Sequence, residues 1–78
     1  MDVRETIIAA IDHSGTSRYA VSKAMGKSTL YIGAMLSRGS VPKTDTMATI
    51  MDAAGFDLLV RSRDDGTEFI IDAKEESE

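Results

Sequence analysis

Five cationic side chains lie in a stretch of the sequence that contains no aspartate or glutamate. The stretch covers residues 13–44, and its cations are Arg18, Lys23, Lys27, Arg38 and Lys43. Guanidinium and ammonium groups bind phosphate oxygens through charge-assisted hydrogen bonds. Elsewhere the balance is reversed, because residues 45–78 hold ten acids against three cations. Such segregation of charge is expected of a binding face, and the alternative is chance variation on a solvated surface.

The residues needed for catalysis or for a metal site are scarce. The 78-residue chain has no cysteine and a single histidine, His13. This excludes disulfides and thiolate metal sites. The sequence also has no glycine-rich phosphate loop and no carboxylate pair placed by an apolar pocket. We therefore expect a small single domain that is not an enzyme and needs no cofactor or metal.

The charge and hydropathy of the chain bear on its location. The net charge is −4, and no apolar run approaches the roughly 20 residues that a membrane-spanning helix needs. The N-terminal residues lack the basic and apolar regions of a signal peptide. The absence of cysteine is consistent with a reducing compartment. We expect a soluble, cytoplasmic protein with no membrane partner.

Apolar residues at helical spacing predict four short helices before residue 56. Their expected inward faces include Ile7, Val21, Ile32, Leu36 and Ile50. The first helix covers residues 2–13. The second begins after Ser17, a good N-cap, and ends at Gly26, where glycine suits the left-handed position. The third covers residues 28–38 with Ser28 as its cap, and Thr44 is expected to cap the fourth, which ends at Gly55.

The apolar period changes to two after Gly55, which predicts a β-hairpin over residues 56–73. Asp65-Gly66 is typical of a two-residue type I′ turn. Such a turn would place Arg63 opposite Glu68 and form an ion pair between them. One face of the hairpin would then carry Leu58, Val60, Phe69 and Ile71, and the other would carry Leu59 and Ile70. The remaining residues, 74–78, are predicted to be an acidic, disordered tail.

A lone two-stranded hairpin is marginal in water, so this one needs to pack on the helices, to pair with another copy, or both. Apolar residues on the second face favour a dimer, and the alternative is that they are ordinary scattered exposed side chains. The residues expected at the dimer interface are Leu59, Arg61 and Ile70.

Residues 17–39 predict two short helices joined by a glycine turn, which is the pattern of a helix-turn-helix. The second helix of such a unit can enter the DNA major groove, which is about 12 Å wide and admits one α-helix. The phosphate-binding cations of the acid-free stretch flank this helix. The pattern therefore indicates double-stranded DNA as a partner.

The same residues resemble the lambda-repressor-like, Cro/XRE-type family of DNA-binding proteins. The motif is Ser17-Arg18-x-x-Val21-Ser22-x-x-Met25-Gly26, and Ile32, Gly39 and Pro42 extend it. The resemblance covers about residues 5–55 and implies a mainly α fold, a helical core of four or five short helices at residues 1–55. The C-terminal hairpin resembles the strand additions of small prophage-type regulators.

The resemblance implies which residues contact DNA. They lie at the start of the second helix, at the turn and outer face of the third helix, and in the following loop. They are Ser17, Arg18, Lys27, Ser28, Thr29, Leu30, Tyr31, Ala34, Arg38, Ser40 and Lys43. Two of them leave alternatives open. Tyr31 could pack its ring under the second helix instead of contacting a base, and Leu30 could be a core residue or could meet a thymine methyl group.

Two functions from different classes remain. The first is a sequence-specific, homodimeric transcriptional regulator, with repression as the expected effect, which inserts helix 28–38 into the major groove. The second is an antitoxin-like or protein-interaction module, in which the acidic hairpin and tail bind a protein partner such as a toxin. The acid-free stretch separates the two, since protein binding alone does not require it.

Overall fold

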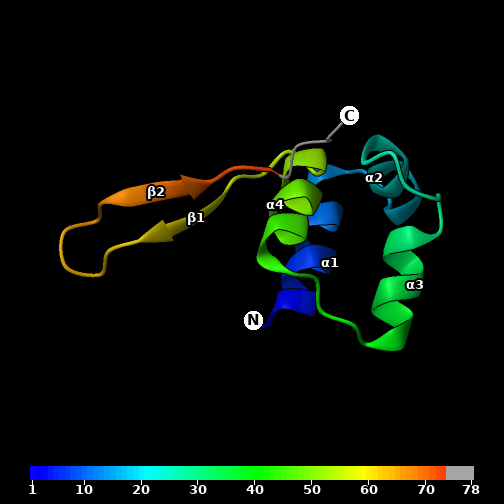
Figure 1. The fold of residues 1–78 in the computed structure, drawn as a ribbon, viewed down its shortest axis with the longest axis horizontal. Coiled ribbons are helices and arrows are strands. Elements are labelled where there is room, and N and C mark those ends of the chain that lie inside the picture. Colours follow the sequence, from blue (N-terminus) through cyan, green and yellow to red (C-terminus); the bar gives the residue numbers. More distant parts are fainter. Residues whose placement is uncertain (74–78) are drawn as a thin grey trace.

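The computed structural model describes residues 1–73, and in this part the chain is mainly helical with a C-terminal antiparallel hairpin (Figure 1). The four helices are α1 (Val3–Ser14), α2 (Arg18–Ala24), α3 (Tyr31–Arg38) and α4 (Thr44–Ala53). They are followed by β1 (Leu58–Arg61) and β2 (Glu68–Ile71). The predicted tail at residues 74–78 lies outside the described residues.

One apolar core joins the four helices. Its largest fully buried members are Ile7 of α1, Val21 of α2, Ile32 and Leu36 of α3, and Ile50 of α4. Burying a side chain of this size contributes about 1.5–3 kcal/mol relative to leaving it exposed. The helical spacing of these residues predicted this core, and the prediction is confirmed.

The ends of the first two helices follow from local hydrogen bonds. Asp2 and Glu5 form a reciprocal capping box at the start of α1. Ser17 caps α2 as predicted, since its Oγ accepts from the Ala20 amide at 3.0 Å. At the end of α2, Gly26 has φ 75°, a left-handed conformation that other residues adopt at a cost. The Lys27 amide then donates to the Ser22 carbonyl and closes the turn.

Two predicted helix starts are wrong. The third helix begins at Tyr31 and not at residue 28. The Tyr31 amide donates to the Ser28 carbonyl, three residues back, so residues 28–31 form a tight turn that precedes the helix. Ser28 Oγ accepts from Leu30 within that turn. The fourth helix has Lys43 as its N-cap, and Thr44 is its first helical residue. Thr29 and Leu30 therefore precede the helix on which they were expected.

The predicted hairpin register is also wrong. Arg61 pairs with Glu68, and a four-residue loop over residues 63–66 replaces the two-residue turn. A type I′ turn needs positive φ at both central residues, whereas Asp65 does not have it and Gly66 does. The ion pair consequently joins Arg61 Nε to Glu68 Oε2, at 2.7 Å, and does not involve Arg63.

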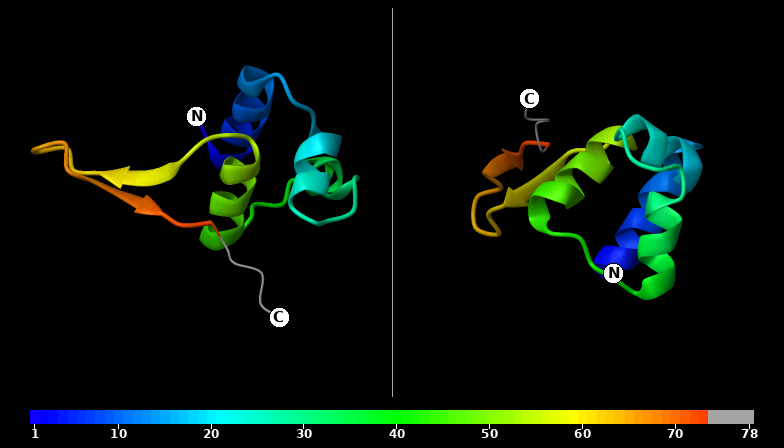
Figure 2. Two further views of the ribbon diagram at one scale, coloured as in Figure 1. Left: turned by 90° about the horizontal axis from the view of Figure 1, so that it is seen from above. Right: turned by 45° about the vertical axis from the view of Figure 1, so that its right-hand side comes forward.

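The error in register leaves the two hairpin faces as predicted. The shift is by two residues, and side chains alternate between faces with a period of two. Leu58 still shares a face with Ile71, and Val60 with Phe69, while Leu59 and Ile70 share the other face. The hairpin projects from the helices as an arm, on the side opposite α3 (Figures 1 and 2).

Candidate DNA-binding surface

The acid-free stretch folds into α2, α3 and the loops that follow them. All five of its cations are exposed, and none forms an ion pair with any residue in the described part of the chain. These cations are therefore not engaged in ion pairs with carboxylates of the described residues. Phosphate groups are suitable ligands for such a surface, because their binding costs no internal ion pair.

Three of the cations surround one shallow depression of about 380 Å³ between α3 and the loop that leads to α4. Lys27 lies before α3, Arg38 ends it, and Lys43 caps α4. The predicted contact residues that line the depression are Lys27, Tyr31, Arg38, Ser40 and Lys43. The structure thus brings together residues that lie up to 16 positions apart in the sequence.

The ring of Tyr31 lies beside one of these cations. Its ring is half-buried against the core, and the Lys27 ammonium lies 5.6 Å from the ring centroid. At this distance the ammonium is attracted by the π-electron face of the ring. The ring thus packs partly against the core, and a contact of Tyr31 with DNA stays a prediction.

Six predicted contact residues lie outside the lining of the depression. Leu30 is 71% exposed and is not a core residue, which removes one of its two alternatives. Ala34 is also exposed and lies one turn further on within α3, where its amide donates to the Leu30 carbonyl at 2.9 Å. Thr29 is half-buried. The remaining residues are Ser17, whose Oγ is used in capping α2, the exposed Arg18, and Ser28.

A buried hydrogen bond sets the position of α3 on α2. Ser22 is fully buried, and its Oγ accepts from the Ile32 amide at 3.0 Å and donates to the Arg18 carbonyl at 2.7 Å. A second link comes from α1, where Arg4 Nε donates to the Leu36 carbonyl at 3.2 Å. Neither link was predicted, because each depends on residues brought together only by the fold.

The depression also contains a carboxylate that the charge pattern did not indicate. Asp45, in the first turn of α4, lines it together with Thr46. In the sequence Asp45 directly follows the acid-free stretch, and the turn of the chain at Pro42 brings it back beside the cations. Negative charge at this rim opposes phosphate binding and is expected to moderate it.

The predicted dimer contacts lie at a distance from this surface. Leu59 is half-buried at the root of the hairpin, Ile70 is 58% exposed, and Arg61 forms the ion pair with Glu68. All three share one face of the hairpin.

Other functional features are limited in the described part of the chain. Among residues 1–73, no group of three or more histidine, aspartate or glutamate side chains is arranged to hold a metal ion. None of the described helices combines the length and the apolar character needed to cross a membrane. Comparisons with protein-family models, curated proteins and solved structures found no match for this chain.

Proposed function

We propose that the protein is a helix-turn-helix DNA-binding regulator of the lambda-repressor-like type, in which α2 and α3 form the DNA-binding unit. The observation that carries the proposal is the group of Lys27, Arg38 and Lys43 around one depression beside α3, exposed and without ion pairs in the described residues. Cations in this arrangement suit phosphates of a duplex beside an inserted helix.

Exposed residues at the N-cap of α3 and within this helix would read the bases. Leu30 and Ala34 offer apolar contacts, which suit the thymine methyl group. Neither supplies the paired hydrogen bonds by which arginine, asparagine or glutamine discriminate bases. We therefore expect modest sequence specificity, with DNA shape as a second contribution.

The regulator would act as a homodimer through its hairpin and would read two half-sites about one helical turn, 34–36 Å, apart. Repression is the expected effect, since a dimer bound at a promoter excludes other proteins from it. The exposed apolar side chains of the hairpin also fit a protein partner such as a toxin, which is the second candidate function.

Charge reversal at the depression tests the DNA-binding proposal. Lys27→Glu combined with Arg38→Glu should abolish binding to duplex sites selected from random sequence, as measured by fluorescence anisotropy at low salt. The helical circular dichroism should remain, because both side chains are exposed.

The matched control compares two single substitutions, each of which replaces an arginine by a glutamate. Arg38→Glu should weaken binding at least tenfold, whereas Arg63→Glu, in the exposed hairpin loop, should leave it nearly unchanged. Equal effects of the two variants, or full affinity in the double variant, would contradict DNA binding at this surface.

A further inference from the structure

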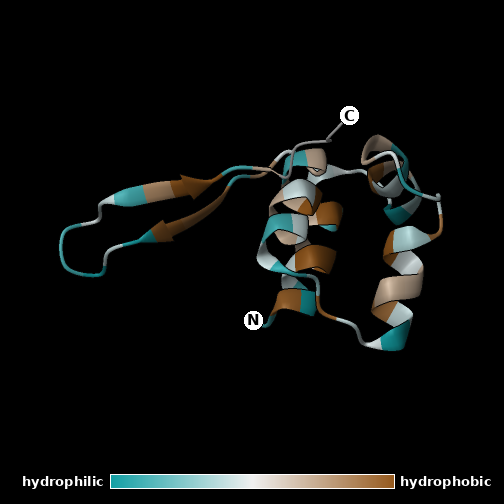
Figure 3. Cartoon of the chain, in the orientation of Figure 1, coloured by the Kyte–Doolittle hydropathy of each residue, from teal (hydrophilic) through white to brown (hydrophobic). Residues whose placement is uncertain are grey.

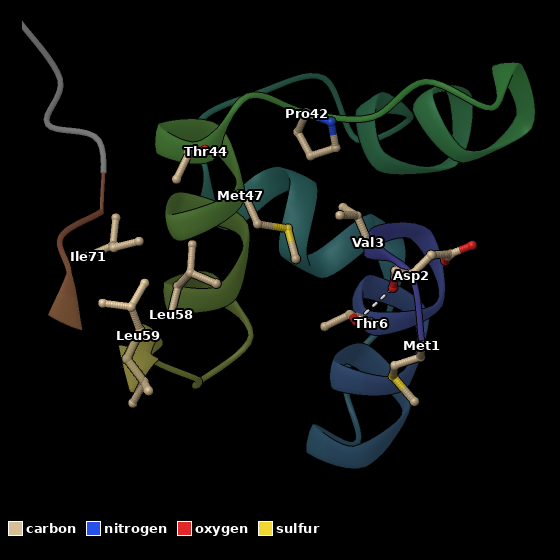
Figure 4. A pocket seen from close by; sticks show the side chains of 11 residues that line it. Met1, Asp2, Val3, Thr6, Pro42, Thr44, Met47, Leu58, Leu59 and Ile71 are labelled. Carbon is tan, nitrogen blue, oxygen red and sulfur yellow. Dashed lines mark hydrogen bonds between the residues drawn. The ribbon is translucent and has the colours of Figure 1, made fainter. Parts of the chain in front are cut away.

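An apolar groove of about 370 Å³ lies where the hairpin leaves the helices. Its lining comes from the root of the hairpin, from α4 and from the first residues of the chain. Figure 4 shows these side chains, among them Leu58, Leu59, Ile71, Met47, Met1, Val3 and Thr6. A second apolar hollow, of about 280 Å³, adjoins the groove, since Met1, Thr6 and Leu58 line both.

The apolar surface continues from the groove along the hairpin. Val60 lines the groove and is 53% exposed, and it pairs across the strands with Phe69, which is 68% exposed. Figure 3 shows hydrophobic residues along both strands and hydrophilic residues in the loop between them. Because an isolated two-stranded hairpin is marginal in water, this surface needs a cover.

Carboxylates border this apolar surface, and no lysine or arginine side chain lines it. Asp2 lines the groove and Asp57 lines the second hollow. Asp57 also lines a smaller hollow of about 110 Å³, together with Asp52 and Asp72. These three carboxylates are exposed and form no ion pair within residues 1–73. They are not arranged to hold a metal ion, so their negative charge remains open to another cation.

We propose that the root of the hairpin binds a cationic, amphipathic segment of a partner protein. Apolar side chains of the segment enter the groove beside Leu58 and Val60, and its lysines or arginines reach Asp57 and the neighbouring carboxylates. The inference deepens the second candidate function, a protein partner on the hairpin, and rests on it. It does not depend on DNA binding.

Charge complementarity selects this occupant. A cationic segment gains attraction to carboxylates that have no partner, in addition to the burial of its apolar side chains. The arm of a second copy would bring Asp64, Asp65 and Glu68 to a surface that is already negative, and like charges placed together oppose association. An anionic partner would be opposed for the same reason.

Two synthetic peptides test the chemistry of the partner. The first has leucines at helical spacing on one face and lysines on the other, and the second has glutamate in place of each lysine. Isothermal titration calorimetry of the full chain should show binding of the lysine peptide and no binding of the glutamate peptide at the same concentrations. Equal affinities, or no binding of the lysine peptide, overturn the proposal.

Two aspartates separate a local contact from general attraction. Asp57→Asn and Asp64→Asn remove the same charge, but Asp57 borders the apolar surface and Asp64 lies in the hairpin loop. Asp57→Asn should weaken binding of the lysine peptide about two- to fivefold, the effect of losing one partly exposed ion pair. Asp64→Asn should leave the affinity unchanged. Equal weakening by both would show that only net charge attracts the peptide, which overturns the proposed site.

Two exposed valines test the apolar part of the contact. Val60 lines the groove, whereas Val41 lines the depression beside α3. Val60→Ser should weaken binding of the lysine peptide several-fold, and Val41→Ser should not change it. Because both side chains are exposed, the helical circular dichroism of both variants should match the parent. A Val41→Ser effect as large as that of Val60→Ser would place the peptide elsewhere.

The same variants test a second copy as the occupant. In sedimentation velocity without peptide, the parent, Val60→Ser and Val41→Ser should have the same oligomeric state. A parent dimer that Val60→Ser dissociates and Val41→Ser retains would assign the groove to a second copy and overturn the proposal.

This inference and DNA binding fail separately. The Lys27→Glu, Arg38→Glu variant should bind the lysine peptide at least as tightly as the parent, because neither cation lines the groove. Loss of DNA binding in a chain that still binds the peptide concerns the depression alone. A chain that binds DNA but not the lysine peptide rejects this inference and leaves the DNA-binding proposal intact.

Discussion

Ser22 is the single residue on which the contact between α2 and α3 most depends. Its hydroxyl is fully buried and both donates and accepts a hydrogen bond, so its burial leaves no polar atom unsatisfied. The Ile32 amide that it satisfies lies in the first turn of α3, where helical amides have no partner within the helix. A side chain of α2 thus supplies a hydrogen-bond acceptor to the N-terminus of α3, the helix that would enter the DNA major groove.

Replacing Ser22 by alanine is expected to destabilise the protein by about 1–3 kcal/mol, the usual cost of leaving a buried donor unpaired. Urea denaturation followed by circular dichroism measures the change. Ser37→Ala, at an exposed position of α3, is the matched control and should change stability by less than about 0.5 kcal/mol. Equal effects at the two positions would show that the buried hydrogen bond is not important.

Asp65 is the residue whose titration should affect the hairpin. Hydrogen bonds from the Thr67 amide, the Thr67 hydroxyl and the Ser62 hydroxyl favour its charged form, so its pKa lies below the usual value. Because the pKa is lower in the folded loop, the carboxylate stabilises the loop at neutral pH, and this contribution is lost as the pH falls through the folded-state pKa.

We therefore expect faster exchange of the Thr67 amide at acidic pH than at neutral pH, after correction for intrinsic exchange, as measured by nuclear magnetic resonance. Asp65→Ala should make the corrected exchange independent of pH in this range. Asp64→Ala, in the same loop, is the control and should retain the dependence. A pH-independent Thr67 amide in the parent chain would contradict the role assigned to Asp65.

At the scale of elements, backbone conformation determines where helices end. Gly26 and Gly33 are suited to a direct comparison, since a Cβ added at either position would meet no atom within 4 Å. They differ in backbone conformation, because Gly26 has φ 75° and Gly33 lies inside α3. Any difference between alanine substitutions at the two sites therefore comes from the backbone.

Gly26→Ala should destabilise the protein by about 1–2 kcal/mol, the cost of placing a Cβ in the left-handed conformation. Gly33→Ala should instead stabilise it by about 0.5–1 kcal/mol, because alanine loses less conformational freedom in a helix. Thermal unfolding of both variants tests this. A stabilising Gly26→Ala would mean that the turn between α2 and α3 is not held in the left-handed conformation.

The hairpin shows the limit of local patterns at the same scale. Asp-Gly is a strong turn signal, yet the loop has four residues, closed by the Ser62 amide on the Thr67 carbonyl at 2.8 Å. The alternation of apolar residues still predicted the two faces, because a shift by two residues conserves them. The face of the hairpin on which a side chain lies is thus predicted more reliably than its cross-strand partner.

At the scale of the whole molecule, charge is separated by position. α3, which Lys27 precedes and Arg38 ends, lies on the side opposite the hairpin (Figure 1). Most carboxylates follow residue 44 in the sequence. A net charge of −4 would by itself argue against a nucleic-acid partner. The separation allows the cationic side to face a duplex while the hairpin loop, with Asp64 and Asp65, points away from it.

Two variants should separate phosphate contacts from base contacts. Arg18→Ala should weaken binding to all duplex sequences alike and lower the slope of log affinity against log salt by about one, as expected for the loss of one phosphate contact. Leu30→Ala should change the order of preference among sequences with little effect on that slope, because its exposed side chain would contact bases. Anisotropy titrations at several salt concentrations measure both. An unchanged slope in Arg18→Ala would contradict its assignment to phosphate.

The sequence by itself determined the four helices, their buried stripe and the two faces of the hairpin. These features depend on the spacing of apolar residues along a single element, so a local pattern contains them. Residues such as Val21, Ile32 and Leu36 were predicted to be buried for this reason, and they are. The helix starts at Tyr31 and Thr44 were missed, since they depend on which carbonyl accepts the first backbone hydrogen bond of each helix.

Only the tertiary structure decided which of these residues meet. It brought Lys27, Arg38 and Lys43 to one depression and added Asp45 to its rim. It also set the apolar arm beside an apolar groove whose lining comes from both ends of the chain. Such contacts join residues far apart in the sequence. They follow from how helices pack on a shared core, and no periodicity within one element contains that information.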